Sequence, residues 1–361
     1  MKPRARELGL PLQGEPGPHN AITDVPGVEV GYRTIRREDE QPAVRTGVTA
    51  ILPFGRGGPL RPAWAGSFAL NGNGEMTGLH WVKDGGYFVG PVCLTNTHSV
   101  GIVHHAAVRY MIDTYRGAFT SDHLWALPVV AETYDGVLSD VLGQRVTEED
   151  ALSAIAAARG GRVAEGSVGG GTGMICYGYK GGSGTSSRRV RTGGVEGVVG
   201  AFVQANFGRP DLFTVCGVPV GRLLAPGGAE PEMGSVIGVV ATDLPMLPHQ
   251  LGRVARRAAL GIARTGSSGG NSSGDLFLAF STANPSPLPQ SGEDVLQFAA
   301  LNDERFDPVY EAVCQAVEEA VLNALLAGEA MTAVRPPGRE VPALDGETLL
   351  RVMRSYGPLP G

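Results

Sequence analysis

The chain has 361 residues, of which 42% are hydrophobic, and a formal net charge of -6. This composition supplies a packed core, and the absence of a dense Lys/Arg stripe argues against a protein that binds a nucleic-acid backbone. No apolar run approaches the length of a membrane span, and the N-terminus lacks the apolar core of a signal peptide. We therefore expect a cytoplasmic protein without a membrane or nucleic-acid partner.

The 54 glycines and 26 prolines predict many turns and short strands. They follow no fixed period, and no low-complexity linker divides the chain, so a single domain over residues 1–361 is favoured. The four cysteines lie far apart without CxxC spacing. They are interpreted as buried free thiols: Cys93, Cys176, Cys216 and Cys314.

The first half of the chain alternates short strands and helices. Residues 1–19 are polar and proline-rich, which is typical of an irregular arm. Apolar patterns predict a strand pair within 22–35 around Pro26-Gly27, and further strands over 47–54, 88–95 and 127–131. Helical spacing predicts a helix over 100–115 with Ser99 as its cap, and one over 147–158 opened by Thr147 with Asp150.

The second half is richer in strands. Apolar runs predict them over 173–179, 194–207, 212–220, 235–242 and 276–282. Short glycine-bearing turns between these runs favour antiparallel or mixed pairing over regular βαβ units. Helices are predicted over 245–263 and 308–327, the second with Asp307 as its cap and Pro308 in its first turn. A strand and a closing helix follow in the tail.

The segment from Arg264 to Asn284 combines features that seldom meet. A run of Gly, Ser and Asn residues passes directly into Asp275 and then into an apolar strand. Such a loop can bring its backbone very close to another group. The simpler interpretation is a flexible turn that enters a buried strand. The functional interpretation makes one of its serines a nucleophile at the mouth of the strand.

Other common kinds of site have weak signals in this sequence. The only adjacent histidines are His104 and His105, and neighbours in a helix point about 100° apart, so no metal is expected. GxSxG spacing occurs at 266–270 and 270–274, but a helix is predicted before this run and a strand after it, so it is not a nucleophile elbow. No catalytic Ser-xx-Lys motif is present. The glycine run over 166–173 lacks the Gly-Lys-Ser/Thr ending of a P-loop, and a strand follows it. It predicts a tight turn or a backbone wall around a small substrate, without a cofactor.

Several polar or aromatic side chains stand at the borders of apolar segments. Glu318 has two structural interpretations, a side chain that reaches solvent or a buried acid that is hydrogen-bonded. Its functional interpretation is a partly desolvated carboxylate that positions or deprotonates a nucleophile. Asn206 and Tyr134 follow apolar strands and are either turn residues or donors for an oxyanion hole. Trp125 is an ordinary core or pocket aromatic.

Eight segments, in order along nearly the whole chain, resemble one family. The sequence is similar to the DmpA-like aminopeptidases, also called L-aminopeptidase D-esterases or β-aminopeptidases, which form peptidase family S58. The segments that carry the resemblance are NAITDVPGVEVG, NGNGEMTG, LTNTHSVG, WALPVVAETYDG, GSVGGGTGM, QANFG, NSSGDLFLAFSTAN and EEAVLNAL.

The resemblance implies a precursor that cuts itself immediately before its nucleophilic serine, which in the family stands directly before Gly-Asp. Here that serine is Ser273, with cleavage after Ser272 into residues 1–272 and 273–361. A serine made N-terminal gains a free α-amine that can act as a base beside its hydroxyl. The small-residue loop also permits the strained approach of an N-to-O acyl shift. Ser272 itself remains the alternative nucleophile.

The resemblance also implies the rest of the site. The oxyanion-hole donors fall on Asn206 and Tyr134, the pocket tryptophan on Trp125 and the helical glutamate on Glu318. Ala316 stands where some relatives carry a serine, so a relay through that hydroxyl is replaced here by the free amine or a water. The family fold is a four-layer αββα sandwich, layered like the N-terminal nucleophile hydrolases, and it usually assembles as a tetramer of cleaved protomers.

We therefore predict an α/β (α+β) enzyme, a self-processed serine aminopeptidase that releases N-terminal residues from short peptides, amides or esters through an acyl-enzyme. Two alternatives are kept. One is the ornithine acetyltransferase family, which shares the fold and self-cleavage but uses a threonine nucleophile. The other is a binding or assembly protein that has kept the fold and lost turnover, which only Ala316 suggests.

Overall fold

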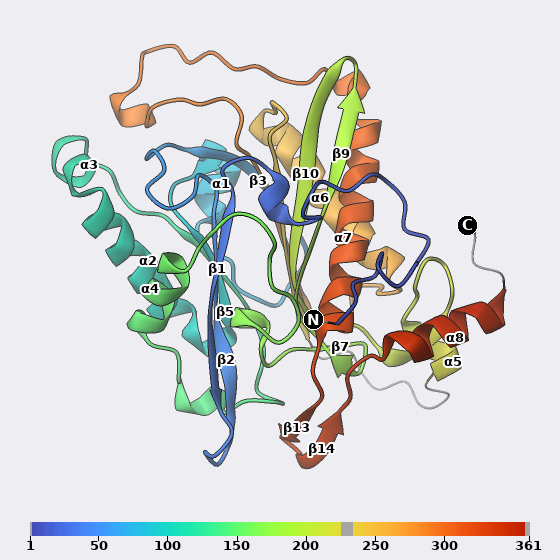
Figure 1. The fold of residues 1–361 in the computed structure, drawn as a ribbon. Helices are drawn as coiled ribbons and strands as arrows, with labels where there is room; N and C mark the ends of the chain where they lie inside the picture. Colours follow the sequence, from blue (N-terminus) through green and yellow to red (C-terminus); the bar gives the residue numbers. More distant parts are fainter. Residues whose placement is uncertain (1, 225–233, 358–361) are drawn as a thin grey trace.

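The structure is a computed structural model that describes residues 2–224 and 234–357. Most of its strands lie in two sheets (Figure 1). The four-stranded sheet has the order β1 (Glu29–Arg37), β2 (Val44–Leu52), β5 (Val92–Asn96) and β6 (Val129–Thr133). The six-stranded sheet has the order β4 (Tyr87–Phe88), β3 (Ala63–Gly72), β12 (Gly274–Ser281), β11 (Ser235–Thr242), β10 (Val195–Asn206) and β9 (Gly182–Thr192).

The remaining elements are two ribbons and the helices. One ribbon pairs β7 (Ile175–Cys176) with β8 (Tyr179–Lys180), and the other pairs β13 (Met331–Val334) with β14 (Pro337–Val341). The longer helices are α2 (Val100–Thr114), α4 (Glu148–Ala156), α6 (Pro248–Arg264), α7 (Asp307–Ala327) and α8 (Gly346–Tyr356). The shorter ones are α1 (Leu79–Gly85), α3 (Arg116–Ser121) and α5 (Val220–Leu224).

The two sheets pack face to face between two pairs of helices. Helices α2 and α4 cover the outer face of the four-stranded sheet, and α6 and α7 cover the six-stranded sheet (Figure 1). Each interface has its own apolar cluster, for example Leu94 with Phe202 between the sheets and Val254 with Val321 beneath the helices. The predicted four-layer αββα sandwich is therefore confirmed.

Strand β12 shows why its sequence is apolar without interruption. Successive side chains of a strand point to opposite faces, and both faces of this strand are covered. Leu276 and Leu278 pack between the sheets, whereas Phe277 packs towards α6 and α7. Strand β12 runs parallel to β11 and antiparallel to β3, so the predicted mixed pairing is also confirmed.

Several strand predictions were wrong. The strand expected over 88–95 is divided between β4 and β5, which lie in different sheets, and the one over 173–179 is the hairpin of β7 and β8. In the 22–35 region a 3-10 turn, Ile22–Asp24, replaces the first strand of the expected pair. Within 212–220 only an isolated bridge joins Val215 to Val218, because Gly217 and Pro219 interrupt the ladder and the apolar residues pack as an irregular segment. Strands β3 and β9 were not predicted at all.

Local capping signals had mixed outcomes. The Thr147–Asp150 capping box is present, with the Asp150 amide donating to Thr147 Oγ1 at 3.3 Å. Ser99 makes no capping hydrogen bond, because a 3-10 turn precedes α2 and Asn96 accepts from its His98 amide. Asp307 is the first residue of α7 and not its cap.

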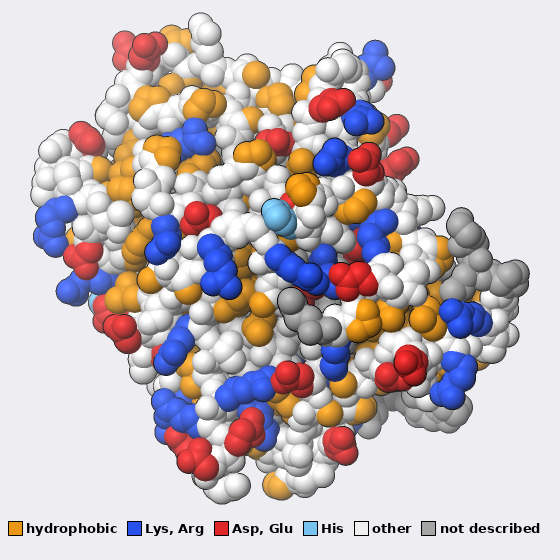
Figure 2. All heavy atoms as spheres, in the orientation of Figure 1, with side chains coloured by type: hydrophobic (Ala, Val, Ile, Leu, Met, Phe, Trp, Pro, Cys, Tyr) orange, Lys and Arg blue, Asp and Glu red, His pale blue; other side chains and the backbone are white. Residues whose placement is uncertain are grey.

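No helix within residues 2–224 and 234–357 has both the length and the apolar character needed to cross a bilayer. No group of three or more His, Cys, Asp or Glu side chains in them is arranged to hold a metal ion. Cys93 and Cys176 are buried as expected, but Cys216 and Cys314 are partly exposed. Figure 2 shows acidic and basic side chains interspersed on one face.

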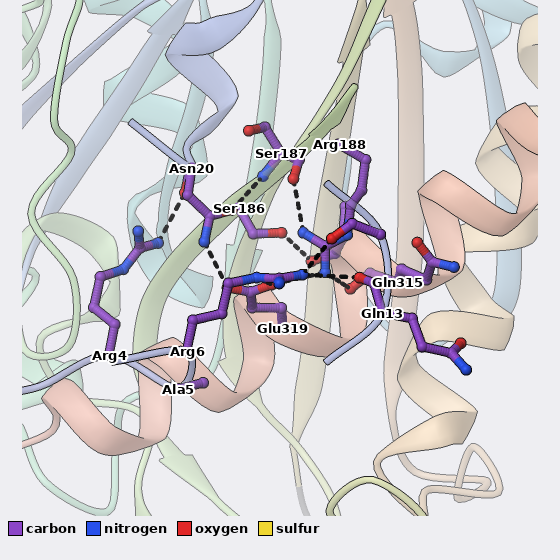
Figure 3. A network of polar contacts seen from close by, with 12 residues as sticks. Arg4, Ala5, Arg6, Gln13, Asn20, Ser186, Ser187, Arg188, Gln315 and Glu319 are labelled. Carbon is purple, nitrogen blue, oxygen red and sulfur yellow. Dashed lines mark hydrogen bonds and ion pairs between the residues drawn. The ribbon is translucent and has the colours of Figure 1, made fainter. Parts of the chain in front are cut away.

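The N-terminal arm is tied to the body of the protein by a buried polar network (Figure 3). Glu319 on α7 accepts hydrogen bonds from Arg188 on β9 at 2.7 Å and from Arg6 at 2.9 Å. Asn20 donates to the other carboxylate oxygen at 2.5 Å. Both Arg188 and Glu319 are almost fully inaccessible to solvent. The network joins segments on either side of the 264–284 stretch.

We expect Glu319→Ala to lower the free energy of unfolding by about 3–5 kcal/mol, because it leaves the buried Arg188 guanidinium without its counter-charge. Equilibrium urea unfolding measures this loss. Glu196→Ala is the matched control, since it removes only the exposed partner of Arg191 and should cost far less. Equal losses for the two variants would contradict the stabilising role of the network.

Candidate active site

The start of β12 is held on both sides. Gly274 lies opposite Gly72 of β3 and opposite Ser235 of β11, in the middle of the six-stranded sheet. A Cβ atom added at Gly274 would come within 2.4 Å of the Asn73 carbonyl oxygen. Position 274 therefore has room only for glycine, and this close approach fixes the residue before it.

Ser273 is completely buried immediately before this strand. Its amide donates to the Gly270 carbonyl oxygen at 2.9 Å, which closes a tight turn. Its hydroxyl donates to Asp275 Oδ1 at 2.6 Å. Such a short bond to a carboxylate is charge-assisted, so the hydroxyl has a defined direction and a nearby proton acceptor.

Two asparagines, Asn71 at the end of β3 and Asn73 in the turn after it, reach the same loop. The Asn71 side-chain amide donates to the Gly270 carbonyl oxygen at 3.0 Å and to Asp275 Oδ2 at 3.2 Å. The Asn73 amide donates to the Ser272 carbonyl oxygen at 2.7 Å. Both oxygens of Asp275 and the backbone around Ser272 are thus held by hydrogen bonds.

A cavity of about 430 Å³ opens beside Ser272. Its lining includes Asn73, Glu132, Tyr134, Asn206 and Ser272. This volume lies within the usual range for small-molecule sites. The structure therefore brings Tyr134 and Asn206 into one cavity with Ser272, and Ser273 lies directly behind it in the chain.

The Asn206 side chain is buried at the end of β10 with a fixed orientation. Its Oδ1 accepts from the Ile175 amide at 2.8 Å, and its Nδ2 donates to the Tyr134 carbonyl oxygen at 3.0 Å. An amide nitrogen carries two hydrogens, so Nδ2 has a second donor besides the one that Tyr134 uses. Asn206 is thus a rigidly mounted donor group in the cavity lining.

Tyr134 is 40% exposed and folds over the next turn. A Cβ atom added at Gly136 would lie 2.3 Å from the Tyr134 hydroxyl oxygen, so this ring position requires glycine at residue 136. Tyr134 lines the cavity with its ring in this position.

Glu132 is a site residue to which no role was assigned from the sequence. It is 3% exposed in the cavity lining, and it accepts hydrogen bonds from the Glu75 amide at 3.1 Å and from the Thr97 hydroxyl. Burial raises the pKa of Glu132, and the bond from Thr97 opposes that rise. A charged residue at the end of an apolar strand, two positions before Tyr134, was the available signal.

Two predicted site residues lie elsewhere. Glu318 lines a different cavity with Cys216 and Arg264, and its carboxylate accepts from Arg264 Nε at 2.5 Å. Burial raises the pKa of Glu318, and the Arg264 guanidinium opposes that rise. Trp125 is 62% exposed and is not part of the 430 Å³ cavity lining. The structure therefore does not bring Glu318 or Trp125 to the cavity of Ser272.

The glycine run over 166–173 forms the expected tight turn. A 3-10 turn spans Gly169–Gly171, and the Gly170 amide donates to Thr49 Oγ1 at 3.1 Å. A Cβ atom at Gly170 would lie 2.2 Å from Gln204 Oε1. Gly173, at the end of the run, lines the 430 Å³ cavity. The run thus fits between the sheets and contributes backbone to the cavity wall.

Comparison with known proteins gives consistent matches over the chain. The model of "Peptidase family S58" matches residues 20–337. The beta-peptidyl aminopeptidase BapA of Sphingosinicella microcystinivorans is 46% identical over 376 residues, which cover 98% of this chain and 92% of that protein. BapA of Sphingosinicella xenopeptidilytica is 43% identical over 382 residues, which cover 99% and 92%.

Solved structures agree with these matches. The L-aminopeptidase D-Ala-esterase/amidase from Ochrobactrum anthropi, described as a prototype of the serine aminopeptidases and a variant of the Ntn hydrolase fold, superposes with a TM-score of 0.95. It is 51% identical, and the match covers 99% of this chain and 100% of that one. A beta-aminopeptidase from Burkholderia sp. has a TM-score of 0.90 and 43% identity, with 99% and 100% coverage.

Asp135, next to Tyr134, generates a prediction about pH. Burial raises the pKa of this carboxyl to about 6, and the nearby polar groups of Thr46 and Asn96 oppose the rise. Within the part of the chain that the structure describes, neither carboxylate oxygen has a hydrogen-bond partner. Between about pH 4 and pH 6 the folded protein therefore holds this proton more tightly than the unfolded chain, and its stability falls as the pH rises through that range.

We expect Asp135→Asn to remove that fall, so that its stability relative to the natural chain increases by about 2 kcal/mol between pH 4 and pH 8. Urea unfolding at both pH values measures the difference. An unchanged difference would show that Asp135 ionises as easily in the folded as in the unfolded chain.

Proposed function

This chain belongs to peptidase family S58, and on that premise we propose that it is an aminopeptidase that acts on short peptides, amides or esters. Ser273 is the proposed nucleophile. The observation that carries this assignment is the 2.6 Å hydrogen bond from the Ser273 hydroxyl to Asp275, directly behind a cavity that contains an amide donor and a buried carboxylate.

The proposed enzyme first cuts its own chain between Ser272 and Ser273 into residues 1–272 and 273–361. In the continuous chain Ser273 is fully buried, whereas Ser272 lines the cavity. Cleavage frees Ser272 to leave this position, so that the hydroxyl and the new α-amine of Ser273 face the cavity. In model peptides that amine titrates near 7.7–8.0, so it is a suitable base at neutral pH.

In the proposed turnover, Ser273 Oγ attacks the substrate carbonyl carbon and passes its proton to the α-amine. The oxyanion accepts hydrogen bonds from Asn206 and from the Tyr134 hydroxyl. The carbon–nitrogen bond breaks, the α-amine returns the proton to the leaving amine, and an acyl-enzyme ester remains on Oγ. Water then hydrolyses this ester and regenerates the free hydroxyl.

Glu132 explains why such an enzyme would remove one residue at a time. Its buried carboxylate lines the same cavity, where it can bind the ammonium group of a substrate's first residue. A substrate held in this way has the carbonyl group of its first residue near the nucleophile. If further residues preceded that carbonyl group, the terminal ammonium group would lie too far away to bind Glu132. The cavity thus favours an exopeptidase over an endopeptidase.

Glu318 has an indirect role in this proposal. Its bond to Arg264 joins the end of α6 to α7, and the loop that leads to Ser273 begins at the next residue. Glu318 is therefore a positioning residue for that loop. Trp125 is kept as a substrate-binding candidate only for the outer part of a substrate, since its side chain is exposed.

The two alternative functions are less well supported. The relatives named above are peptidases, and serine occupies the proposed cut, where the ornithine acetyltransferase family has threonine. The inactive-protein alternative rests on Ala316, which lies inside α7 and accepts a hydrogen bond from Ser186 through its backbone. We further propose a tetramer of cleaved protomers in the cytoplasm, where its cysteines stay reduced.

We expect Ser273→Ala to give a single uncut chain that does not hydrolyse alanine p-nitroanilide, because the variant lacks the attacking hydroxyl. Intact-mass measurement and denaturing electrophoresis detect the cut. Ser272→Ala is the matched control, and it should be processed and active. Fragments from the Ser273→Ala chain would instead assign the nucleophile to Ser272.

We expect Glu132→Gln to lower kcat/KM for substrates with a free α-ammonium group by about 10- to 100-fold, because a charge-assisted bond contributes about 1.5–3 kcal/mol. Steady-state kinetics measure this loss. Burial raises the pKa of Glu132, so KM of the natural enzyme should increase as the pH falls through that pKa and the carboxylate is neutralised. The glutamine variant should lack this increase. Glu196→Gln, which changes an exposed glutamate of β10, should behave like the natural enzyme.

A further inference from the structure

The bond between Ser272 and Ser273 has a hydrogen-bond donor of its own. The Asn73 side-chain amide donates to the Ser272 carbonyl oxygen at 2.7 Å. The side-chain bonds of Asn206, the proposed donor for substrate turnover, are instead made with the Ile175 amide at 2.8 Å and the Tyr134 carbonyl oxygen at 3.0 Å. Different side chains therefore donate to the two carbonyl groups: Asn73 to the one attacked in self-cleavage, and Asn206 to the one attacked in the proposed turnover.

The position of Asn73 follows from close packing of two strand ends. It stands between Gly72, which pairs with Gly274, and Gly74, whose added Cβ would lie 3.4 Å from the Gly274 Cα atom. The Asn73 carbonyl oxygen would lie only 2.4 Å from a Cβ atom added at Gly274. The turn after β3 is thus pressed against the start of β12, and this contact delivers the amide to Ser272.

The attacking group is prepared on the other side of the same bond. Ser273 Oγ donates to Asp275 Oδ1 at 2.6 Å, and Asn71 donates to the second oxygen of Asp275 at 3.2 Å. The Ser273 amide is meanwhile bonded to the Gly270 carbonyl oxygen at 2.9 Å. An acceptor for the hydroxyl proton and a donor for the carbonyl oxygen therefore flank a single peptide bond.

We propose that Asn73 and Asp275 are the catalytic residues of self-cleavage, and that Asn73 is the oxyanion donor for this step in place of Asn206. This inference rests on the function proposed above. Asp275 takes the proton from Ser273 Oγ while Oγ bonds to the Ser272 carbonyl carbon, and Asn73 stabilises the oxyanion that forms.

The remaining steps balance without a further reactant except water. The bond from the Ser272 carbonyl carbon to the Ser273 nitrogen breaks, and Asp275 transfers its proton to that nitrogen. The product is an ester between residue 272 and Ser273 Oγ. Water hydrolyses this ester, which leaves a carboxylate on Ser272 and a free hydroxyl and α-amine on Ser273.

The two asparagines allow a reciprocal test with the full-length chain. Each variant is made by cell-free translation, and its cleavage is followed over time by denaturing electrophoresis and intact mass. We expect Asn73→Ala to slow cleavage by about 10²- to 10³-fold, which is the usual effect of removing one oxyanion donor. Asn206→Ala should be cleaved at the natural rate but lose turnover of alanine p-nitroanilide by a similar factor. Asn302→Ala, on the surface, is the matched control for both measurements.

A folding control separates catalysis from structure. Asn73→Ala is combined with Ser273→Ala, so that neither this chain nor the Ser273→Ala reference can be cut, and their urea midpoints are compared. Equal midpoints assign the slow cleavage to the lost donor. If the midpoint falls, the isosteric Asn73→Asp variant decides, because it keeps the shape but replaces the donor with an acceptor, and it should also be slow.

If the Asn73→Ala chain is cleaved at the natural rate, the inference is wrong. If the alanine variant is unstable, the inference is wrong when the Asn73→Asp chain is cleaved at the natural rate. These outcomes differ from failure of the proposed function. In that case the natural chain itself would remain uncut and would not hydrolyse aminoacyl p-nitroanilides.

Discussion

The approach of two strand ends at Gly274 is the constraint on which the site depends. The turn after β3 lies so close to the start of β12 that no side chain fits at this position. Strand β11 fixes the other side of the same residue. Because β12 is held in the centre of a sheet that is covered on both faces, the residues just before it cannot move as an ordinary loop would. A glycine-rich segment therefore becomes rigid where its backbone must be placed accurately.

The sequence predicted best those features that depend on neighbouring residues. The apolar run of β12 and the Thr147–Asp150 capping box are local patterns, and both are present. Strand β9 was missed because many of its buried residues are polar, and their partners are distant in the chain. Arg188, for example, pairs with Glu319. No pattern within β9 indicates that this charge is compensated.

The candidate site shows the same division. Tyr134, Asn206 and Ser272 meet in one cavity, and each stands beside an apolar strand that the sequence revealed. Glu318 has the helical environment expected of a buried acid, but its partner is Arg264 of another helix. Glu132 was not expected at the site but lies in it. The pairing of β5 with β6 brings Thr97 close enough to hold the Glu132 carboxylate in the cavity. Contacts between elements that are distant in the chain decide which polar residues converge, and the spacing of residues along the sequence does not specify these contacts.

The central position of β12 has a further consequence for a chain that is cut just before it. Its neighbours β3 and β11 both precede the cut, while α7, which also follows the cut, lies against β9 and β10. The two pieces are interleaved, so neither has a complete core when separated from the other. Folding must therefore come first, and a mature molecule that unfolds would have to reassemble from two chains with no covalent link between them. The lifetime of such an enzyme therefore depends on its rate of unfolding more than on its equilibrium free energy of unfolding.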